Sequence, residues 1–295
     1  MSPAKAPELP LVESILHPTD FSDGSESAFA HALAVALLRQ THLTLLHVSA
    51  HSIEEGWSQF PPVRKTLERW GLLEPGSPRS AVYRELGVRV QKVAAKGRNP
   101  AQAILEQIEK EPVELIVLAT EGRDGIPRWL RGSVAESVAR DSDTMTLFVP
   151  RGVRGFVGVE DGNLSLRRIL VPVAVQPSAQ AAVQFAARAA ALIGEDDVEI
   201  MLLHVGDEMP DLELPAESAP RFRKVLRDGG VEDEIVAAAD EMGADLVVMV
   251  TEGPSSLIDA LRGTTTENVL RRVACPVLTV PVQWLRSVAA GRLTE

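Results

Sequence analysis

The sequence predicts an α/β fold with two tandem domains, each a parallel five-stranded sheet flanked by helices. Short apolar runs bounded by turn residues alternate with segments of helical periodicity, and the second half of the chain repeats the first. A length of 295 residues also suits two hydrophobic cores. Strands separated by helices need crossover connections, which place helices on the faces of a parallel sheet.

The repeat is clearest in TEGRDGIPRWLRGSVAESV at 120–138 and TEGPSSLIDALRGTTTENV at 251–269, so that Thr251 corresponds to Thr120. Both stretches contain a Gly, nine intervening positions, a second Gly, a hydroxyl residue and a Glu three positions later. Near the front of each half, SILHPTDFS at 14–22 matches RILVPVAVQ at 168–176. Self-similarity over such a length indicates two copies of one domain rather than a short-period solenoid.

The elements of the first copy follow from its hydrophobic pattern. The segment from Ser25 to Gln40 has Ala28, Ala32, Val35 and Ala36 at helical spacing, and residues 88–97 alternate as in a strand. The predicted order is strand 14–18, helix 25–40, strand 43–48, strand 88–97, helix 101–111, strand 114–120, helix 132–141 and strand 145–150.

The repeat divides the chain into two predicted domains and a linker between them. Residues 12–150 form the first domain, residues 151–164, with four glycines, form a linker, and residues 165–282 form the second domain. The second domain repeats the order with a shortened middle, and its first helix, 178–193, is rich in Ala. The polar, Pro-containing stretch 52–81 occurs only in the first domain; it either covers a surface or a partner, or is a peripheral helix with a loop.

Composition excludes several classes of function. The net charge is −11 without any basic block, so nucleic acid is not an expected partner. No apolar run reaches the length of a membrane span, and the N-terminus lacks the pattern of a signal peptide. Cys275 is the only cysteine, which excludes an internal disulfide and favours a cytoplasmic location and a buried, inert thiol.

The repeated Gly-rich segment has two compatible interpretations. Ser133 followed by Glu136 fits a capping box, which satisfies backbone N–H groups at a helix start. That interpretation leaves the conserved distance between Gly122 and Gly132 in the two copies unexplained. Glycines let a backbone approach a phosphate closely, and a helix that opens at Ser133 adds unpaired N–H groups for an anion.

Four motifs in order resemble the universal stress protein family: HPTDFSDGSESA, GRNPAQAI, ELIVLATEG and GSVAESVARDSDTMTLFVP. The resemblance covers nearly all of residues 12–150 and, more loosely, residues 165–282. It implies a Rossmann-like fold of the adenine nucleotide alpha hydrolase type. One branch of the family binds ATP through Gly, two residues, Gly, nine residues, Gly, then Ser or Thr. On this chain that motif implies the cofactor-binding positions Ala119, Gly122, Gly132, Ser133 and Val134.

Two departures from the family motif affect the expected site. Ala119 stands where the first Gly of the motif belongs, and in the second copy Val250 occupies that position. The family also places an acid after the first strand, where it contacts the adenosine part of the ligand. That acid corresponds to Asp20, whose other role is to start the next helix, and the second copy has Ala174 there. The resemblance further implies that the first and fourth strands are neighbours, which would bring Asp20 close to the Gly loop.

The expected function is a cytoplasmic stress-response protein whose first domain binds ATP, or alternatively AMP or ADP, with or without Mg²⁺, as a regulatory ligand. The second domain is then structural, with a degenerate site. No residue is recognisable as catalytic and no metal-binding set is expected, so slow ATP hydrolysis is the most that the resemblance leaves open. The alternative is a nucleotide-free tandem scaffold that acts through protein–protein association.

Association follows from the last strands, MTLFVP at 145–150 and PVLTVP at 276–281, which are apolar and would be hazardous as open edges. The family pairs such strands between subunits. Two copies on one chain can pair them internally, which predicts an intramolecular pseudo-dimer, and whole chains can form a homodimer in addition. The histidines of the two LLHV segments, His47 and His204, match each other and predict a shared packing position before a ligand role.

Overall fold

The structure, a computed structural model, describes residues 12–50, 57, 59–120, 134–153, 155–193, 198–215, 221–251 and 265–282. The first repeat contains β1 (Ser14–Pro18), α1 (Asp23–Arg39), β2 (His42–Ser49), α2 (Val63–Arg69), α3 (Ala81–Leu86), β3 (Arg89–Lys96), α4 (Pro100–Lys110), β4 (Leu115–Thr120), α5 (Val134–Asp141) and β5 (Met145–Pro150). The second repeat contains β6 (Arg168–Pro172), α6 (Gln180–Ile193), β7 (Glu199–Val205), β8 (Phe222–Arg227), α7 (Val231–Met242), β9 (Leu246–Thr251), α8 (Thr265–Arg272) and β10 (Val277–Pro281).

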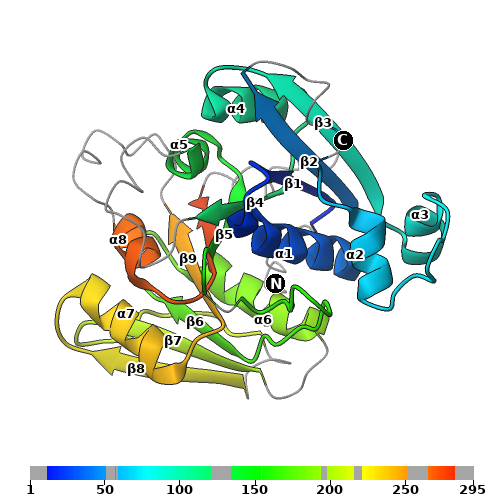
Figure 1. The fold of residues 1–295 in the computed structure, drawn as a ribbon. Helices are drawn as coiled ribbons and strands as arrows, with labels where there is room; N and C mark the ends of the chain where they lie inside the picture. Colours follow the sequence, from blue (N-terminus) through cyan, green and yellow to red (C-terminus); the bar gives the residue numbers. More distant parts are fainter. Residues whose placement is uncertain are drawn as a thin grey trace, which may run out of the picture.

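All these strands form one sheet in the order β3-β2-β1-β4-β5-β10-β9-β6-β7-β8 (Figure 1). Within each repeat the neighbouring strands are parallel, so each repeat contributes a five-stranded parallel sheet. The predicted fold class is confirmed. β1 pairs directly with β4, which places the first and fourth strands side by side as the resemblance implied.

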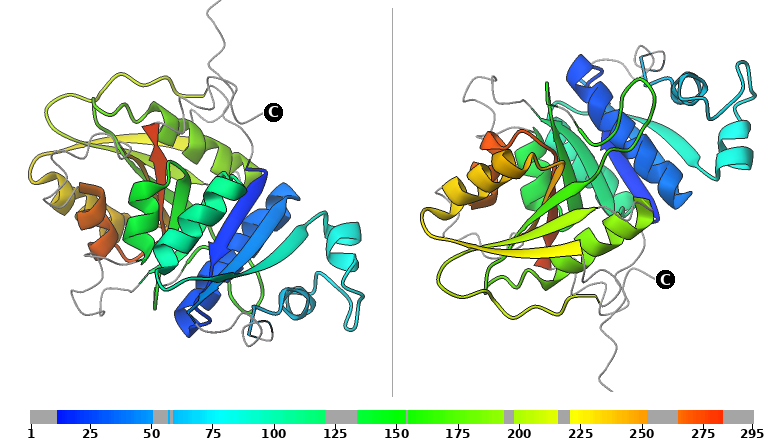
Figure 2. Two further views of the ribbon diagram at one scale, coloured as in Figure 1. Left: turned by 90° about the horizontal axis from the view of Figure 1, so that it is seen from above. Right: turned by 90° about the horizontal axis from the view of Figure 1, so that it is seen from below.

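Helices cover both faces of the sheet (Figure 2). Ile15 of β1 faces α1, and on the other side of the same strand Leu16 faces α4 and α5. The second repeat copies this arrangement, with α6 on the α1 side and α7 and α8 on the other. Strands buried on both faces are continuously apolar, as parallel strands of α/β proteins are. None of the described helices is long and apolar enough to cross a membrane.

The two repeats join through their last strands. β5 and β10 are antiparallel, and Leu278 lies opposite Leu147, which is its own equivalent in the first repeat. Pairing of equivalent residues is the mark of an isologous contact, here made within one chain. The predicted internal pairing of the last strands is confirmed, and it removes two apolar edges at once.

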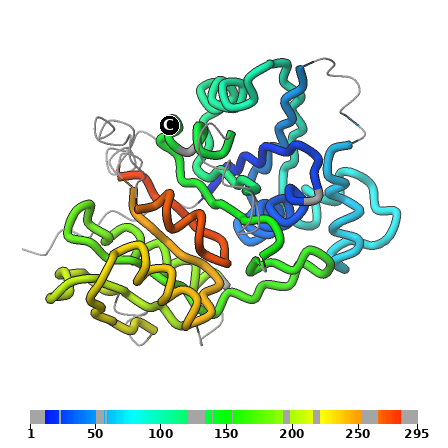
Figure 3. Tube along the Cα trace, turned by 60° about the vertical axis from the view of Figure 1, so that its left-hand side comes forward, coloured from blue at the N-terminus to red at the C-terminus, as the bar shows by residue number. Residues whose placement is uncertain are grey.

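The stretch present only in the first repeat contains α2 and packs against the linker (Figure 3). The Nε1–H of Trp70 donates to the carbonyl oxygen of Val159 at 2.9 Å, and Arg69 donates to the same oxygen at 3.0 Å. Gly162, at φ +69°, lies against the Trp70 ring so closely that an added Cβ would be 2.5 Å from Cδ2. The described part of the stretch 52–81 thus contains a helix, as one alternative predicted, and it also covers a surface, which is that of the linker.

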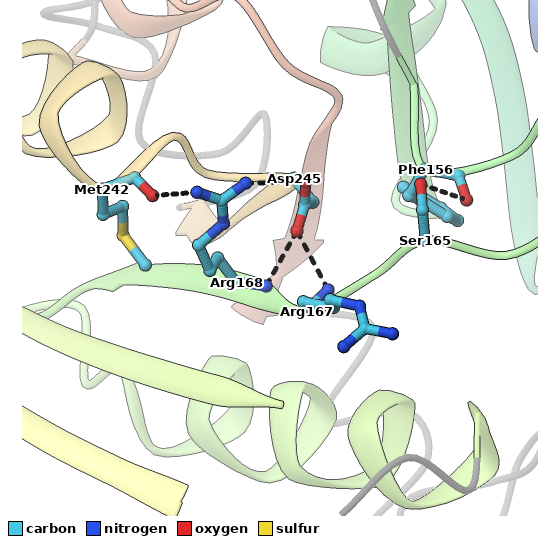
Figure 4. A network of polar contacts seen from close by, with 6 residues as sticks. All are labelled: Phe156, Ser165, Arg167, Arg168, Met242 and Asp245. Carbon is cyan, nitrogen blue, oxygen red and sulfur yellow. Dashed lines mark hydrogen bonds and ion pairs between the residues drawn. The ribbon is translucent and has the colours of Figure 1, made fainter. Parts of the chain in front are cut away.

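Each repeat uses a carboxylate to hold the start of its first strand. Asp245 accepts the backbone N–H groups of Arg167 and Arg168, both at 2.9 Å (Figure 4). Glu114, its equivalent in the first repeat, accepts the N–H groups of Glu13 and Ser14. The N–H groups at a strand start lack ladder partners, so the carboxylate satisfies them and fixes the first strand against the fourth.

Candidate functional site

The candidate site is the edge of the first repeat where β1 and β4 end. In open parallel sheets, ligands bind at the carboxyl ends of the strands where the strand order reverses, which is here between β1 and β4. Ala119 lies half-buried on β4, one residue before its end, and half-buried Val134 is the first residue of α5. Gly122, Gly132 and Ser133 lie outside the described residues.

Asp20 follows β1 with its side chain exposed. Its Oδ1 accepts the backbone N–H of Ser22 at 3.0 Å and the Ser22 hydroxyl at 2.6 Å. Partial burial raises the pKa of Asp20, but the bonds from Ser22 outweigh it and leave the pKa below its ordinary value. Asp20 therefore orders the turn before α1 and also presents a charged oxygen to solvent.

The residue after Asp20 has an unusual backbone. Phe21 has a positive φ of 64°, which is rare for a bulky side chain. Its N–H donates to the Thr19 hydroxyl at 3.1 Å, and its ring stacks on His47 with centroids 4.0 Å apart. Such strained residues persist only where the surroundings hold them, and they concentrate at functional sites.

His47 supports this loop from β2. Its Nδ1–H donates to the carbonyl oxygen of Thr19 at 2.9 Å, and in the second repeat His204 makes the same bond to Val173 at 2.7 Å. The shared packing position predicted for the two histidines is confirmed. In the first repeat His47 has the additional task of supporting the Phe21 ring.

Further aromatic rings come from the stretch that only the first repeat has. Phe60 meets Phe21 edge-on at 5.4 Å between centroids and is buried, whereas Trp57, 5.6 Å from Phe60, is exposed. The ammonium group of Lys92 on β3 lies 5.4 Å from the Phe60 ring centroid. The loop after β1 is thus bordered by aromatic rings and one cation. Aromatic rings of this kind provide faces on which a purine stacks.

The second repeat lacks these features. Ala174 has no carboxylate, and Val175, which corresponds to Phe21, is 69% exposed. Among the described residues, no aromatic contact involves His204. The degenerate second site stays a prediction, because the segment 252–264 that would complete it lies outside the described residues.

Phe21 and Phe60 were not predicted from the sequence. Phe21 differs from its counterpart Val175, so comparing the two copies position by position would have singled it out. Phe60 has no counterpart, because it lies in the stretch that the second repeat lacks. Only the folded chain brings it to the loop after β1.

Comparison with known proteins agrees with this architecture. A model of the universal stress protein family matches residues 12–150 and 211–281. Universal stress protein MJ0531 of Methanocaldococcus jannaschii is 29% identical over 159 residues, which cover 48% of this chain and 84% of that protein. Universal stress protein YxiE of Bacillus subtilis is 29% identical over 142 residues, which cover 44% of this chain and 93% of that protein.

A similar solved structure spans nearly the whole chain. The crystal structure of a universal stress protein from Archaeoglobus fulgidus has a TM-score of 0.60 and covers 91% of this chain and 98% of that one, at 18% identity. At that identity the likeness shows the fold alone. The family model matches well over half of the residues in two segments, one in each repeat, and the chain therefore belongs to the universal stress protein family.

Proposed function

We propose that this universal stress protein binds an adenine nucleotide in its first repeat as a regulatory ligand, with the second repeat structural. ATP is the first choice, with ADP and AMP as alternatives, each with or without Mg²⁺. We place the protein in the cytoplasm. The observation that supports the proposal most directly is the exposed Asp20 carboxylate directly after β1, the strand that pairs with β4.

The described residues fit the adenosine part of such a ligand. A carboxylate oxygen accepts hydrogen bonds from ribose hydroxyls, and the half-buried Phe21 ring, stacked on His47, adds aromatic surface at the same loop, against which a base can pack. The phosphates would lie toward Gly122, Gly132, Ser133 and Val134, beyond Ala119. The first repeat has both the acid and the ring, and the second has neither.

Calorimetric titration of ATP, with and without Mg²⁺, tests the proposal on the wild type and on Asp20→Ala. A hydrogen bond to a charged group contributes on the order of 1.5–3 kcal/mol, so we expect at least a tenfold loss of affinity in Asp20→Ala. Absence of heat with the wild type, or equal affinity in the variant, would remove the proposal.

Asp161→Ala is the matched control. Asp161 also accepts the N–H of the residue two positions on, Asn163, at 3.0 Å, but it lies in the linker. Its replacement removes the same type of turn without touching the candidate site, so we expect unchanged ATP affinity. Thermal unfolding of all three proteins checks that they are folded.

The alternative of a nucleotide-free scaffold gives a different result in a simpler experiment. Protein purified without added ligand is denatured by heat, and the released small molecules are identified by mass spectrometry. Adenine nucleotide at a substantial molar fraction supports the proposal, and its absence together with a silent titration favours the scaffold.

A further inference from the structure

Arg151 is the first residue after β5 and lies at the same edge of the sheet as Asp20. Its backbone N–H donates to the carbonyl oxygen of Thr120 at 2.6 Å. Thr120 is the last residue of β4, from which the chain enters the Gly122–Gly132 segment. The backbone of Arg151 is therefore fixed beside the end of β4, the strand that pairs with β1.

The side chain of Arg151 runs from there along the first turn of α1. A Cβ added to Gly24 would lie 3.1 Å from Cδ of Arg151 and 3.4 Å from Nε. Gly24 is the second residue of α1. Its presence leaves room for the close approach of the arginine. Arg151 thus extends from the end of β5 toward the turn that Asp20 organises.

The guanidinium group of Arg151 has no hydrogen bond or ion pair with the described part of the chain, although the side chain is exposed and charged. Other arginines of the molecule are engaged by carboxylates, such as Arg140 by Asp141 and Arg227 by Glu241. A guanidinium group presents a planar set of donors that suits phosphate oxygens, and it keeps its charge at every physiological pH.

The second repeat lacks this arrangement too. The position equivalent to Arg151 is Val282, and the position equivalent to Gly24 is Ser178. The arginine and the glycine that makes room for it are therefore replaced together, in the same repeat in which Ala174 replaces the acid. Both repeats have the same fold, but Arg151 and Asp20 occur together only in the first repeat. The arginine is therefore not required by the fold.

We propose that Arg151 is a ligand-binding residue that contacts a phosphate group of the nucleotide whose adenosine part lies at the Asp20 loop. The inference rests on the proposed function and assigns the preference for phosphorylated over unphosphorylated ligand to this side chain. Asp20 then accounts for binding of the adenosine part, and Arg151 accounts for the increase in affinity that the phosphates of the nucleotide bring.

Calorimetric titration of the full chain with ATP, AMP and adenosine separates the two roles. We expect Arg151→Ala to weaken ATP roughly ten- to a hundredfold while adenosine affinity stays unchanged, since only the phosphates lose a charged partner. Arg151→Lys keeps the charge without the planar donors, so its affinity for ATP should lie between those of the wild type and Arg151→Ala. Arg84→Ala, which removes an exposed arginine from α3, is the matched control and should leave all affinities unchanged.

Gly24→Ala is the second test, because it displaces the Arg151 side chain without removing its charge. We expect a smaller loss for ATP and none for adenosine, and this variant carries the test should Arg151→Ala fail to fold. Unchanged ATP affinity in both variants, or equal losses for ATP and adenosine, overturns the role of Arg151 and leaves nucleotide binding intact. A wild type that binds neither ATP nor adenosine overturns the proposed function and this inference with it.

Discussion

Two histidines are buried in the first repeat, and each has one ring nitrogen without a partner in the described part of the chain. His17 on β1 donates from Nδ1 to the carbonyl oxygen of Val117 at 2.9 Å, and His31 on α1 donates to Ser27 at 2.7 Å. Burial lowers the pKa of each from 6.5 to about 4, against the smaller opposing effect of the hydrogen bond. Both rings are therefore neutral in the folded protein at neutral pH.

These lowered pKa values predict acid sensitivity. Between pH 6.5 and about 4 the unfolded chain binds a proton at each histidine and the folded chain does not, so the free energy of unfolding falls as the pH falls through this window. At pH 5 the loss is on the order of 2 kcal/mol per histidine. Urea unfolding at pH 7 and at pH 5 measures this loss in the free energy of unfolding.

His31→Phe should remove about half of that pH dependence, because an apolar ring in the same place cannot take up a proton. His42→Gln, at an exposed position on β2, is the control and should keep the full dependence. An identical pH dependence in His31→Phe and the wild type would show that His31 is not the group that titrates.

At the scale of elements, the linker is held by the first repeat on two sides. Trp70, directly after α2, contacts Gly162 and Val159. On α1, the ring of His31 meets Phe156 edge-on at 4.6 Å between centroids. Phe60, shortly before α2, contacts the Phe21 ring at the candidate site. One short stretch of chain thus contacts both the proposed ligand loop and the connection to the second repeat.

Gly162→Ala tests how closely the linker packs on Trp70. The new Cβ would be 2.5 Å from the indole, and the residue would also keep a positive φ of 69°, so we expect the free energy of unfolding to fall by about 2–3 kcal/mol. Gly152→Ala is the matched control, since Gly152 has φ +73° with nothing within 4 Å of an added Cβ. It should cost only the backbone strain, about 1 kcal/mol. Equal losses in urea unfolding would show that the contact with Trp70 contributes nothing.

At the scale of the whole molecule, the ten-stranded sheet makes the two repeats one structural unit. β5 belongs to the first repeat and β10 to the second, yet each borders the other, and Leu147 and Leu278 are both 3% exposed. A parallel sheet of five strands would otherwise leave an apolar last strand open on each repeat. The pairing therefore stabilises both repeats together.

Leu278→Asp should disturb the first repeat as well as the second. A charge buried at the shared border costs about 3 kcal/mol or more, and the loss of β10 pairing exposes the N–H groups of β5. Hydrogen exchange should then show reduced protection in β5 as well as in β9 and β10. Leu192→Asp, at a 42% exposed position on α6, is the control. Protection retained in β5 while β10 exchanges freely would mean that the repeats are stable independently.

Prediction from the sequence succeeded where hydrophobic period and internal repetition carry the information. The strands and helices of both copies follow from their periodicity, and α1, predicted at 25–40, is found at Asp23–Arg39. The matching roles of His47 and His204 follow from repetition alone. The candidate site was predicted less completely. Asp20 was identified through the family motif. Phe21 lies in the same motif without a role assigned to it, and Arg151 lies outside the four motifs, so both become evident only as differences between the two copies.

The sequence by itself determined the α/β class, the tandem repeat, the shortened middle of the second copy and the asymmetry between Asp20 and Ala174, because each is written in residue order and spacing. The tertiary structure decided which distant residues meet: Phe60 with Phe21, Trp70 with Gly162, and Arg151 with Gly24. These contacts depend on crossovers and on a loop whose path no local pattern encodes. Periodicity reports which face of an element is buried, and only the packed chain selects what lies against it.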